Sequence, residues 1–300
     1  MTQTRNPKAM HGNKVGVMWP QSPTGRASLM DLNTEPDLVL SDDVLIVGFK
    51  ADPEAVRAYV PEPLELDGSG TMYIKAVQRW GYTSRNATEF ISFERLNQTE
   101  SFFWIPCSYE GKEFYFVPFS WGNRDWLGYT GRLVGMPHKW AKVQMTSFHS
   151  FHPTYNEAHA GARICASVEN MGLVHRLYGD LKEVIRPEDT PFKWVQGSCP
   201  HFLGHRYIWD SVKGRPLAND LVAHYGDDVE MGPVWHGDGW VQFFDAENDE
   251  VLQFQPREML GSWFFTLRFT HQKSSPYIVY DYGDESPYAN RPRIKELLGR

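Results

Sequence analysis

The stretch GRLVGMPHKWAKV, residues 131–143, places a reactive type of side chain among apolar ones. Lys139 follows His138 and precedes Trp140. Two interpretations of this lysine are open. Its carbon stem can pack on the core while the ammonium reaches water, or the amine is there to react. A reacting amine must be unprotonated, and apolar neighbours such as Met136 and Trp140 lower the pKa of a lysine from its reference of about 10.4.

A carboxylate with a candidate chemical role is Glu100, in the run NQTESFFWIPCSY. Five largely apolar residues follow it, so we place it where a strand enters the core. A solvated charge at a strand end is the alternative interpretation, and composition alone favours that alternative. A carboxylate that does enter the core beside a lysine or histidine is suited to proton transfer.

Other titratable groups have simpler interpretations. The segment FHSFHPTYNEAHA, residues 148–160, is rich in histidine, but its spacing matches no zinc motif, so we interpret it as a polar loop. His236 and Asp238 in PVWHGDGW are interpreted as part of a hairpin turn. No GxSxG, Walker or Rossmann glycine motif occurs in the sequence. We therefore predict no metal and no cofactor.

The bulk composition is that of a folded soluble protein, with 300 residues, 41% hydrophobic residues, 22% charged residues and a net charge of −7. This balance argues against a nucleic-acid binder, which needs a basic face. No apolar run approaches the ~20 residues that span a bilayer, and the first residues hold no signal core. Three widely spaced cysteines are typical of reduced thiols. The prediction is a cytoplasmic protein that binds no membrane.

The elements that must position these groups are mostly strands. Apolar or alternating runs recur from DDVLIVGFKAD to WFFTLRFTHQ, separated by Gly, Asn, Asp and Pro, and YEGKE suggests a hairpin. Asp52 and Pro53 begin a short helix that later prolines end, while HRLYGDLKEVIR and NRPRIKELLGR are further helix candidates. The prediction is an α+β, β-rich fold with few short helices, whose antiparallel sheets form a closed cone or barrel around an internal pocket. Residues 1–40 are expected to form an extended arm, and 41–300 one domain.

Three stretches resemble the acetoacetate decarboxylase superfamily. They are ADPEAVRAYVPEPLEL, the core from TESFFWIP to MPHKWAK and, more weakly, VQFFDAEN with YIVYDY. The resemblance implies a β-rich cone around a buried pocket, homo-oligomeric subunits, and a pocket lysine that forms a Schiff base with a keto acid. It also implies that Glu100 is a pocket carboxylate.

The chain departs from the family pattern at several positions. The family has two lysines after the proline, and the first is the nucleophile; here His138 takes the first place and Lys139 the second. Neighbouring strand residues point to opposite faces, so either His138 faces the pocket or a bulge turns Lys139 into it. The place of the family's carboxylate-binding arginine falls near Asp42. Arg79, Arg95 and Arg132 are candidates to replace that arginine, and we group Arg132 with Met136 and Trp140 as predicted substrate-binding residues.

Three hypotheses of function follow. The first is a Schiff-base lyase that acts on a small or natural-product-like keto acid by decarboxylation or aldol and dehydration chemistry, with Lys139 as nucleophile and Glu100 as proton shuttle. The second is an enzyme without an imine, in which His138 and Glu100 perform acid–base work such as enolisation, hydration or cyclisation. The third is a non-catalytic protein that binds a small molecule. The first is preferred from the sequence.

Overall fold

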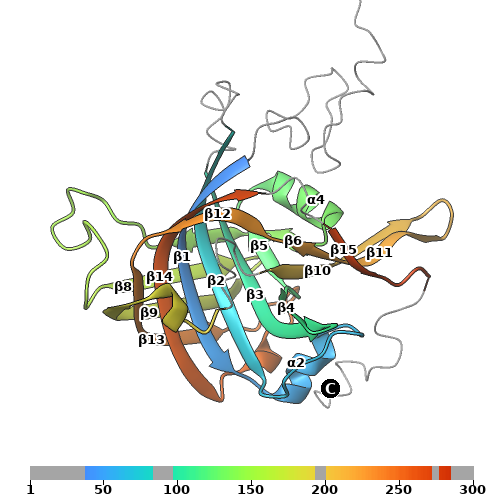
Figure 1. Cartoon of the computed structure of the whole chain (residues 1–300), viewed down its shortest axis with the longest axis horizontal. Coiled ribbons are helices and arrows are strands. Elements are labelled where there is room, and N and C mark those ends of the chain that lie inside the picture. The colour runs from blue at the N-terminus through green and yellow to red at the C-terminus, as the bar shows by residue number, and fades with distance from the viewer. Residues whose placement is uncertain (1–37, 84–96, 193–200, 272–276, 285–300) are drawn as a thin grey trace, which may run out of the picture.

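The computed structural model describes residues 38–83, 97–192, 201–271 and 277–284, and the sequence-predicted arm falls outside them up to residue 37. Strands dominate these residues (Figure 1). The elements in chain order are β1 (Leu38–Lys50), α2 (Pro53–Tyr59), β2 (Thr71–Thr83), β3 (Gln98–Tyr109), β4 (Lys112–Phe116), β5 (Ser120–Gly122), α4 (Asp125–Leu133), β6 (His138–Trp140), β7 (Lys142–Met145), β8 (Arg163–Glu169), β9 (Leu173–Ile185), a 3₁₀ turn (Pro187–Asp189), β10 (Phe202–Asp210), β11 (Arg215–His224), β12 (Gly226–Met231), β13 (Val234–Phe243), a 3₁₀ turn (Leu252–Phe254), β14 (Glu258–His271) and β15 (Tyr277–Asp281).

One large sheet contains all the described strands, in the order β15-β11-β10-β4-β3-β2-β1-β14-β13-β9-β8-β7. Strand β12 joins it beside β14, and β5 links β3 to β6. Most pairs are antiparallel, while β10 with β4 and β5 with β6 are parallel. The predicted β-rich α+β class is confirmed, although the hydrogen-bonded path between the described strands does not close on itself.

Strands β1, β2 and β3 are long and carry apolar side chains on both faces. Alternation along each strand separates two packed clusters. The first, called here the Glu100 face, includes Val44, Val77 and Phe102. The second, called the Trp121 face, includes Phe103 and Trp121. Because a shift by one residue exchanges the two faces, the strand register decides which polar side chains meet.

Several local predictions are confirmed. Helix α2 begins after Asp52, whose carboxylate accepts the Glu54 amide at 2.9 Å, and it ends at Tyr59 before Pro61. The YEGKE segment forms the β3–β4 hairpin, where Glu110 and Gly111 take positive φ angles of 49° and 76°. Such a pair of angles matches the right-handed twist of the strands that the turn joins.

Two local predictions are wrong. HRLYGDLKEVIR does not form a helix, because residues 173–185 pair as β9 with both β8 and β13. The segment around His236 is not a hairpin turn but the interior of β13, with a register shift beside Gly237. A Cβ at residue 237 would overlap the backbone of the neighbouring strand. The absence of a side chain at Gly237 therefore allows the two strands to approach closely. The helix candidate NRPRIKELLGR lies outside the described residues.

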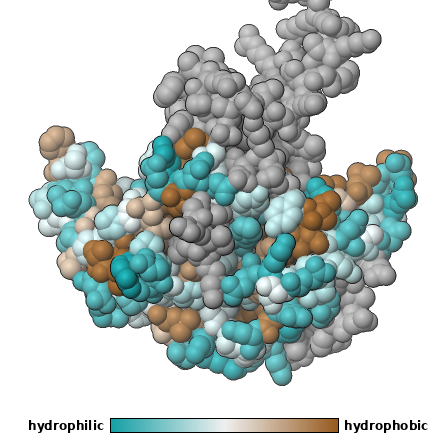
Figure 2. Space-filling view, in the orientation of Figure 1, coloured by the Kyte–Doolittle hydropathy of each residue, from teal (hydrophilic) through white to brown (hydrophobic). Residues whose placement is uncertain are grey.

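The surface is mainly polar. In the view of Figure 2, hydrophilic side chains cover most of the described part and apolar side chains form small separate patches. Scattered apolar side chains of this kind are ordinary for a folded chain. None of the helices within the described ranges is long and apolar enough to cross a membrane.

Candidate active site

Glu100 lies on β3 and is 1% exposed. Its Oε1 accepts hydrogen bonds from the Nη1 of Arg79, at 3.3 Å, and from the amide nitrogen of Gln98. Arg79 in turn binds the buried carboxylate of Asp42 through Nε and Nη2, both at 2.8 Å. These four side chains and His138 are called here the polar cluster.

Strand register brings the cluster together from distant parts of the sequence. Asp42 lies opposite Arg79 in the β1–β2 pair, and Arg79 lies opposite Gln98 in the β2–β3 pair. Glu100 follows Gln98 by two residues, so both project from the same face of β3. Paired residues of antiparallel strands also share a face, and so all four belong to the Glu100 face.

His138 reaches the same face through a β5–α4–β6 crossover. It opens β6 and lies opposite Ser120 of β5, which itself lies opposite Phe102 of β3. Its ring packs edge-on against Phe102 with 5.4 Å between centroids, and its Nε2 is 3.8 Å from Glu100 Oε2. Helix α4 also lies against the ring, because a Cβ at Gly131 would overlap the imidazole.

Burial controls the charge of both groups. The pKa of His138 falls to about 3, first because burial disfavours the imidazolium and second because Arg79 is positive. The pKa of Glu100 is raised, mainly by burial and further by Asp42, while Arg79 and Lys75 oppose the rise. At neutral pH His138 is therefore a neutral imidazole, and its approach to Glu100 is not an ion pair.

Two buried polar atoms near the cluster have no partner among the described residues. They are His138 Nδ1 and the hydroxyl oxygen of Ser120. The two residues are 5% and 1% exposed and lie opposite each other. Buried polar groups are nearly always hydrogen-bonded, so unpartnered ones need an explanation such as a substrate contact.

Lys139 is turned away from the polar cluster. Its Nζ donates to the Asp249 carboxylate at 2.7 Å and to the backbone oxygen of Asn248 at 2.5 Å. It lies opposite Trp121 in the β5–β6 pair, on the opposite face from His138. Of the two registers left open by the sequence, the structure has the one that directs His138 toward Glu100.

The other sequence-predicted site residues are dispersed. Met136 is buried in the apolar cluster of the Glu100 face. Arg132 is exposed, and Trp140 is 59% exposed. The structure thus brings Met136, His138 and Glu100 onto one face, and it leaves Lys139, Arg132 and Trp140 outside it.

Sequence reasoning did not select Asp42, Gln98, Ser120 or Lys75, and named Arg79 only as one of three arginines. Polar residues spaced by two or four along apolar strands were the available signal, as in Gln98 and Glu100, or Lys75 and Arg79. That alternation shows a shared face within one strand. It does not show which strands pair, so the cluster could not be assembled.

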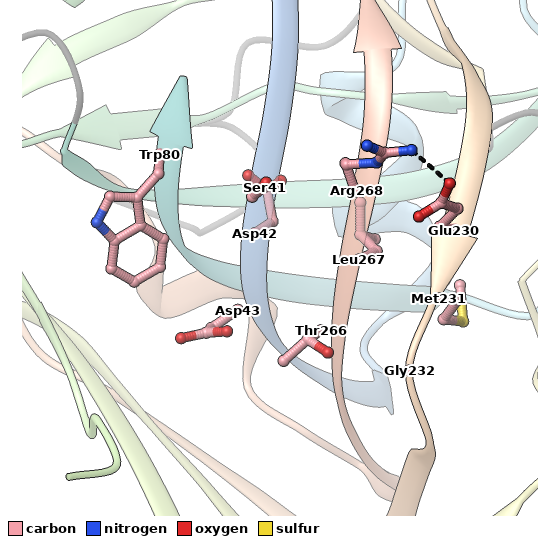
Figure 3. A pocket seen from close by; sticks show the side chains of 10 residues that line it. All are labelled: Ser41, Asp42, Asp43, Trp80, Glu230, Met231, Gly232, Thr266, Leu267 and Arg268. Carbon is pink, nitrogen blue, oxygen red and sulfur yellow. Dashed lines mark hydrogen bonds and ion pairs between the residues drawn. The ribbon is translucent and has the colours of Figure 1, made fainter. Parts of the chain in front are cut away.

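A separate surface groove of about 390 Å³ lies between β2, β1, β14 and β12 (Figure 3). Trp80 stands at one side and the Arg268–Glu230 ion pair at the other. Asp43 and Thr266 project between them, and neither Glu100 nor His138 lines this groove. The groove meets the polar cluster at Asp42, which lines the groove and also binds Arg79 of the cluster.

The histidine-rich segment 148–160 forms a loop between β7 and β8, as predicted. Its side chains are engaged locally, with His152 Nδ1 accepting the Tyr155 amide at 2.8 Å. Over the described residues, no three His, Cys, Asp or Glu side chains lie close enough together to hold a metal ion.

Comparisons with known proteins agree with this architecture. A family model described as Acetoacetate decarboxylase (ADC) matches residues 19–282. Acetoacetate decarboxylase 1 of Bradyrhizobium diazoefficiens is 24% identical over 244 residues, covering 80% of this chain and 85% of that protein. The acetoacetate decarboxylase of Paraburkholderia phytofirmans is 23% identical over 256 residues, covering 85% of this chain and 90% of that protein.

Solved structures show the same fold at low identity. The enduracididine biosynthesis enzyme MppR, complexed with the condensation product of pyruvate and imidazole 4-carboxaldehyde, matches with a TM-score of 0.74 and 22% identity, covering 88% of this chain and 96% of that one. An acetoacetate decarboxylase-like enzyme from Sphingomonas wittichii RW1 matches with a TM-score of 0.74 and 21% identity, covering 86% and 97%.

Proposed function

Because the chain belongs to the acetoacetate decarboxylase family, we propose that it is an enzyme that moves protons at the carbon next to the carbonyl group of a small keto acid. The observation that carries this proposal is the burial of Glu100 and His138 together, with Nε2 and Oε2 3.8 Å apart, while Lys139 is bound to Asp249 on the opposite face. The second hypothesis from the sequence is thus preferred over the Schiff-base hypothesis.

Glu100 acts as the base. Its ionised carboxylate takes the proton from the carbon, and the electrons of the broken C–H bond move into the carbonyl to give an enolate. The same group then returns the proton to carbon or oxygen. A carboxyl group whose pKa is raised by burial suits this work, because its proton affinity is closer to that needed near neutral pH.

His138 stabilises the charge that develops on the carbonyl oxygen. A pKa of about 3 keeps its ring neutral, so the ring donates a hydrogen bond as an uncharged group. His138 and Ser120 are partners in the β5–β6 pair, and the Nδ1 of the first and the hydroxyl of the second, which have no partner among the described residues, suit an oxyanion contact. Aldol addition or dehydration can follow from the same enolate.

Lys139 is not assigned the nucleophile's role in this proposal. Its Nζ is 2.7 Å from a carboxylate that is itself fully buried, so the amine is already engaged in an ion pair. It also lies on the face away from Glu100.

The test is hydrogen exchange into pyruvate in D₂O, followed by NMR of the methyl protons. Pyruvate is chosen because one solved structure of MppR is complexed with it. We expect exchange well above the buffer rate, and Glu100→Gln should slow it by ~10²–10⁴-fold. The control is Lys142→Met, since Lys142 forms an exposed ion pair with Glu169 and is not a member of the polar cluster.

Three outcomes would overturn the proposal. The first is no exchange above the buffer rate with pyruvate, 2-oxobutyrate or acetoacetate. The second is full activity in Glu100→Gln, and the third is borohydride trapping of pyruvate on Lys139.

We also propose that the chain assembles into a homo-oligomer. Exposed aromatic residues on several strands, such as Trp209, support this proposal. Light scattering that gives a monomer at micromolar concentration would contradict it.

A further inference from the structure

The surface groove between β2, β1, β14 and β12 has the size and the lining of a small-molecule site (Figure 3). Its volume of about 390 Å³ lies within the range of ~300–1,000 Å³ that such sites occupy. The proposed reaction does not use it, because neither Glu100 nor His138 lines it. Its side chains therefore call for an explanation of their own.

Strand register places the polar side chains of the groove on one side of the sheet. Asp43 follows Ser41 by two residues on β1, so both project from the same side of the strand. Asp43 lies opposite Thr266 of β14, and Ser41 lies opposite Trp80 of β2. Asp43 and Trp80 are thus diagonal neighbours, a spacing that an aromatic side chain bridges. One carboxylate, two hydroxyl groups and an indole ring share the groove.

The charge of Asp43 is the one that the groove does not balance. The other two carboxylates that line it are paired, Asp42 with Arg79 and Glu230 with Arg268. Asp43 has no ion pair or hydrogen-bond donor to its carboxylate within the described part of the chain. Burial first, and then the charge of Asp42, raise its pKa, and no cation acts in the opposite direction. A carboxylate partly removed from water in this way is stabilised by a bound cation.

The neighbours of Asp43 fit an organic ammonium group. Such a group carries three N–H donors, and the carboxylate with the hydroxyls of Ser41 and Thr266 supplies matching acceptors. The indole of Trp80 offers an apolar surface and a ring face that attracts cations. A metal ion fits less well, since Ca²⁺ takes about six to eight oxygen ligands, and no three acidic, His or Cys side chains of the described ranges lie close enough to hold one.

We infer that this groove binds a small primary ammonium compound with an apolar body, its ammonium on Asp43 and its body against Trp80. The Arg268–Glu230 ion pair limits the far side of the groove and adds no net charge, so one positive charge on the ligand balances Asp43. The inference concerns a site separate from Glu100 and His138. It stands or falls independently of the proposed function.

The test measures binding of 2-phenylethylamine by calorimetry, with 2-phenylethanol as a neutral molecule of nearly the same shape. We expect the wild type to bind the amine more tightly than the alcohol. Asp43→Asn should weaken binding of the amine by roughly 10- to 150-fold and leave the alcohol nearly unchanged, because a hydrogen bond between charged groups is lost. Trp80→Ala should weaken both compounds, since each places the same phenyl ring against the indole.

The matched control is Asp238→Asn. It removes the same charge from an exposed ion pair with Lys182, and Asp238 does not line the groove. This variant should bind the amine as the wild type does. An equal loss of binding in Asp238→Asn and Asp43→Asn would reduce the effect to overall charge and would contradict the inference.

Two further results would overturn the inference. One is no binding of 2-phenylethylamine by the wild type at millimolar concentration, and the other is equal binding by the wild type and Asp43→Asn. Thermal unfolding shows whether each variant is folded. Trp80→Ala changes a side chain that is 37% exposed and keeps the test decisive if Asp43→Asn does not fold, because unchanged binding of the amine in it also contradicts the inference.

Discussion

Asp249 and Glu100 are both buried carboxylates, but their surroundings satisfy them to different extents. Asp249 accepts hydrogen bonds from Trp121 Nε1 at 3.1 Å, Lys139 Nζ at 2.7 Å and Asn170 Nδ2 at 2.8 Å. Both of its oxygens therefore have donors. Glu100 accepts hydrogen bonds from Arg79 and Gln98 at Oε1, and its Oε2 faces His138 at 3.8 Å, too far for a hydrogen bond.

Under the proposed function, this difference distinguishes a structural carboxylate, Asp249, from a catalytic one, Glu100. Asp249 joins the 3₁₀ turn region to β5 and β6 and fixes their relative positions. Beside Glu100, by contrast, the buried Nδ1 of His138 and the hydroxyl of Ser120 have no partner among the described residues, an arrangement suited to a substrate. Two consecutive residues, His138 and Lys139, belong to these two different environments because strand neighbours point to opposite faces.

The largest expected effect on stability is that of Asp249→Ala. Removing the carboxylate leaves the buried indole N–H of Trp121 and the amide of Asn170 without their acceptor. We expect a loss of about 3 kcal/mol in the free energy of unfolding, because each buried unsatisfied donor costs about 1–3 kcal/mol and Lys139 can turn to water. Urea unfolding of the variant and the wild type measures this loss of unfolding free energy.

Glu100→Gln provides the contrast for that experiment. Glutamine keeps the size and an oxygen acceptor for Arg79 and removes a buried charge, so its effect on unfolding should be less than about 1 kcal/mol. If Asp249→Ala proved harmless, or Glu100→Gln proved the more destabilising of the two, the assignment of structural and chemical roles would be reversed.

The sequence predicted the β-rich class because its aromatic and β-branched runs alternate over the length of strands, as in β2 and β14. It could not predict that HRLYGDLKEVIR also forms a strand, because local helix propensity is overridden when the segment pairs with β8 on one side and β13 on the other. The family resemblance is what made Glu100 a candidate site residue, and the structure shows that this side chain is buried. Choosing between His138 and Lys139 needed the β5–β6 register, and this contact arises only from tertiary structure.

Two buried histidines, one on each face, allow the faces to be compared through the pH dependence of folding stability. His138 on the Glu100 face and His175 on the Trp121 face both have a pKa lowered to about 3, by burial in each case and also by Arg79 for His138. The unfolded chain binds these protons near pH 6.5, so folded stability falls as the pH drops below that value. Between pH 7.5 and pH 5 each histidine should account for a loss of about 2 kcal/mol.

Urea unfolding at several pH values measures this in wild type, His138→Gln and His175→Gln. Each variant should lose about 2 kcal/mol less than wild type over that range. Glu100 has the opposite sign, because its raised pKa means that the folded state holds the proton more tightly and gains stability as the pH falls toward 4.5. Glu100→Gln should therefore steepen the acid loss, and parallel curves for all four proteins would show that these groups do not titrate as described.

The smallest expected effect concerns the helix that holds His138 in place. A Cβ at Gly131 of α4 would overlap the imidazole, whereas a Cβ at Gly128 of the same helix would meet only the His138 backbone oxygen at 3.6 Å, an ordinary contact. Both substitutions to alanine gain similar helix propensity, about 1 kcal/mol, so a difference in exchange rate between the two variants isolates the clash with the ring.

We expect Gly131→Ala to slow pyruvate exchange about tenfold by displacing His138 from the substrate oxygen, since small misplacements of catalytic groups cost up to ~10²-fold. Gly128→Ala should exchange at the wild-type rate and unfold at slightly higher urea. Equal rates in the two variants would mean that the position of the His138 ring does not matter to the reaction, and the charge-stabilising role would then pass from His138 to Ser120 alone.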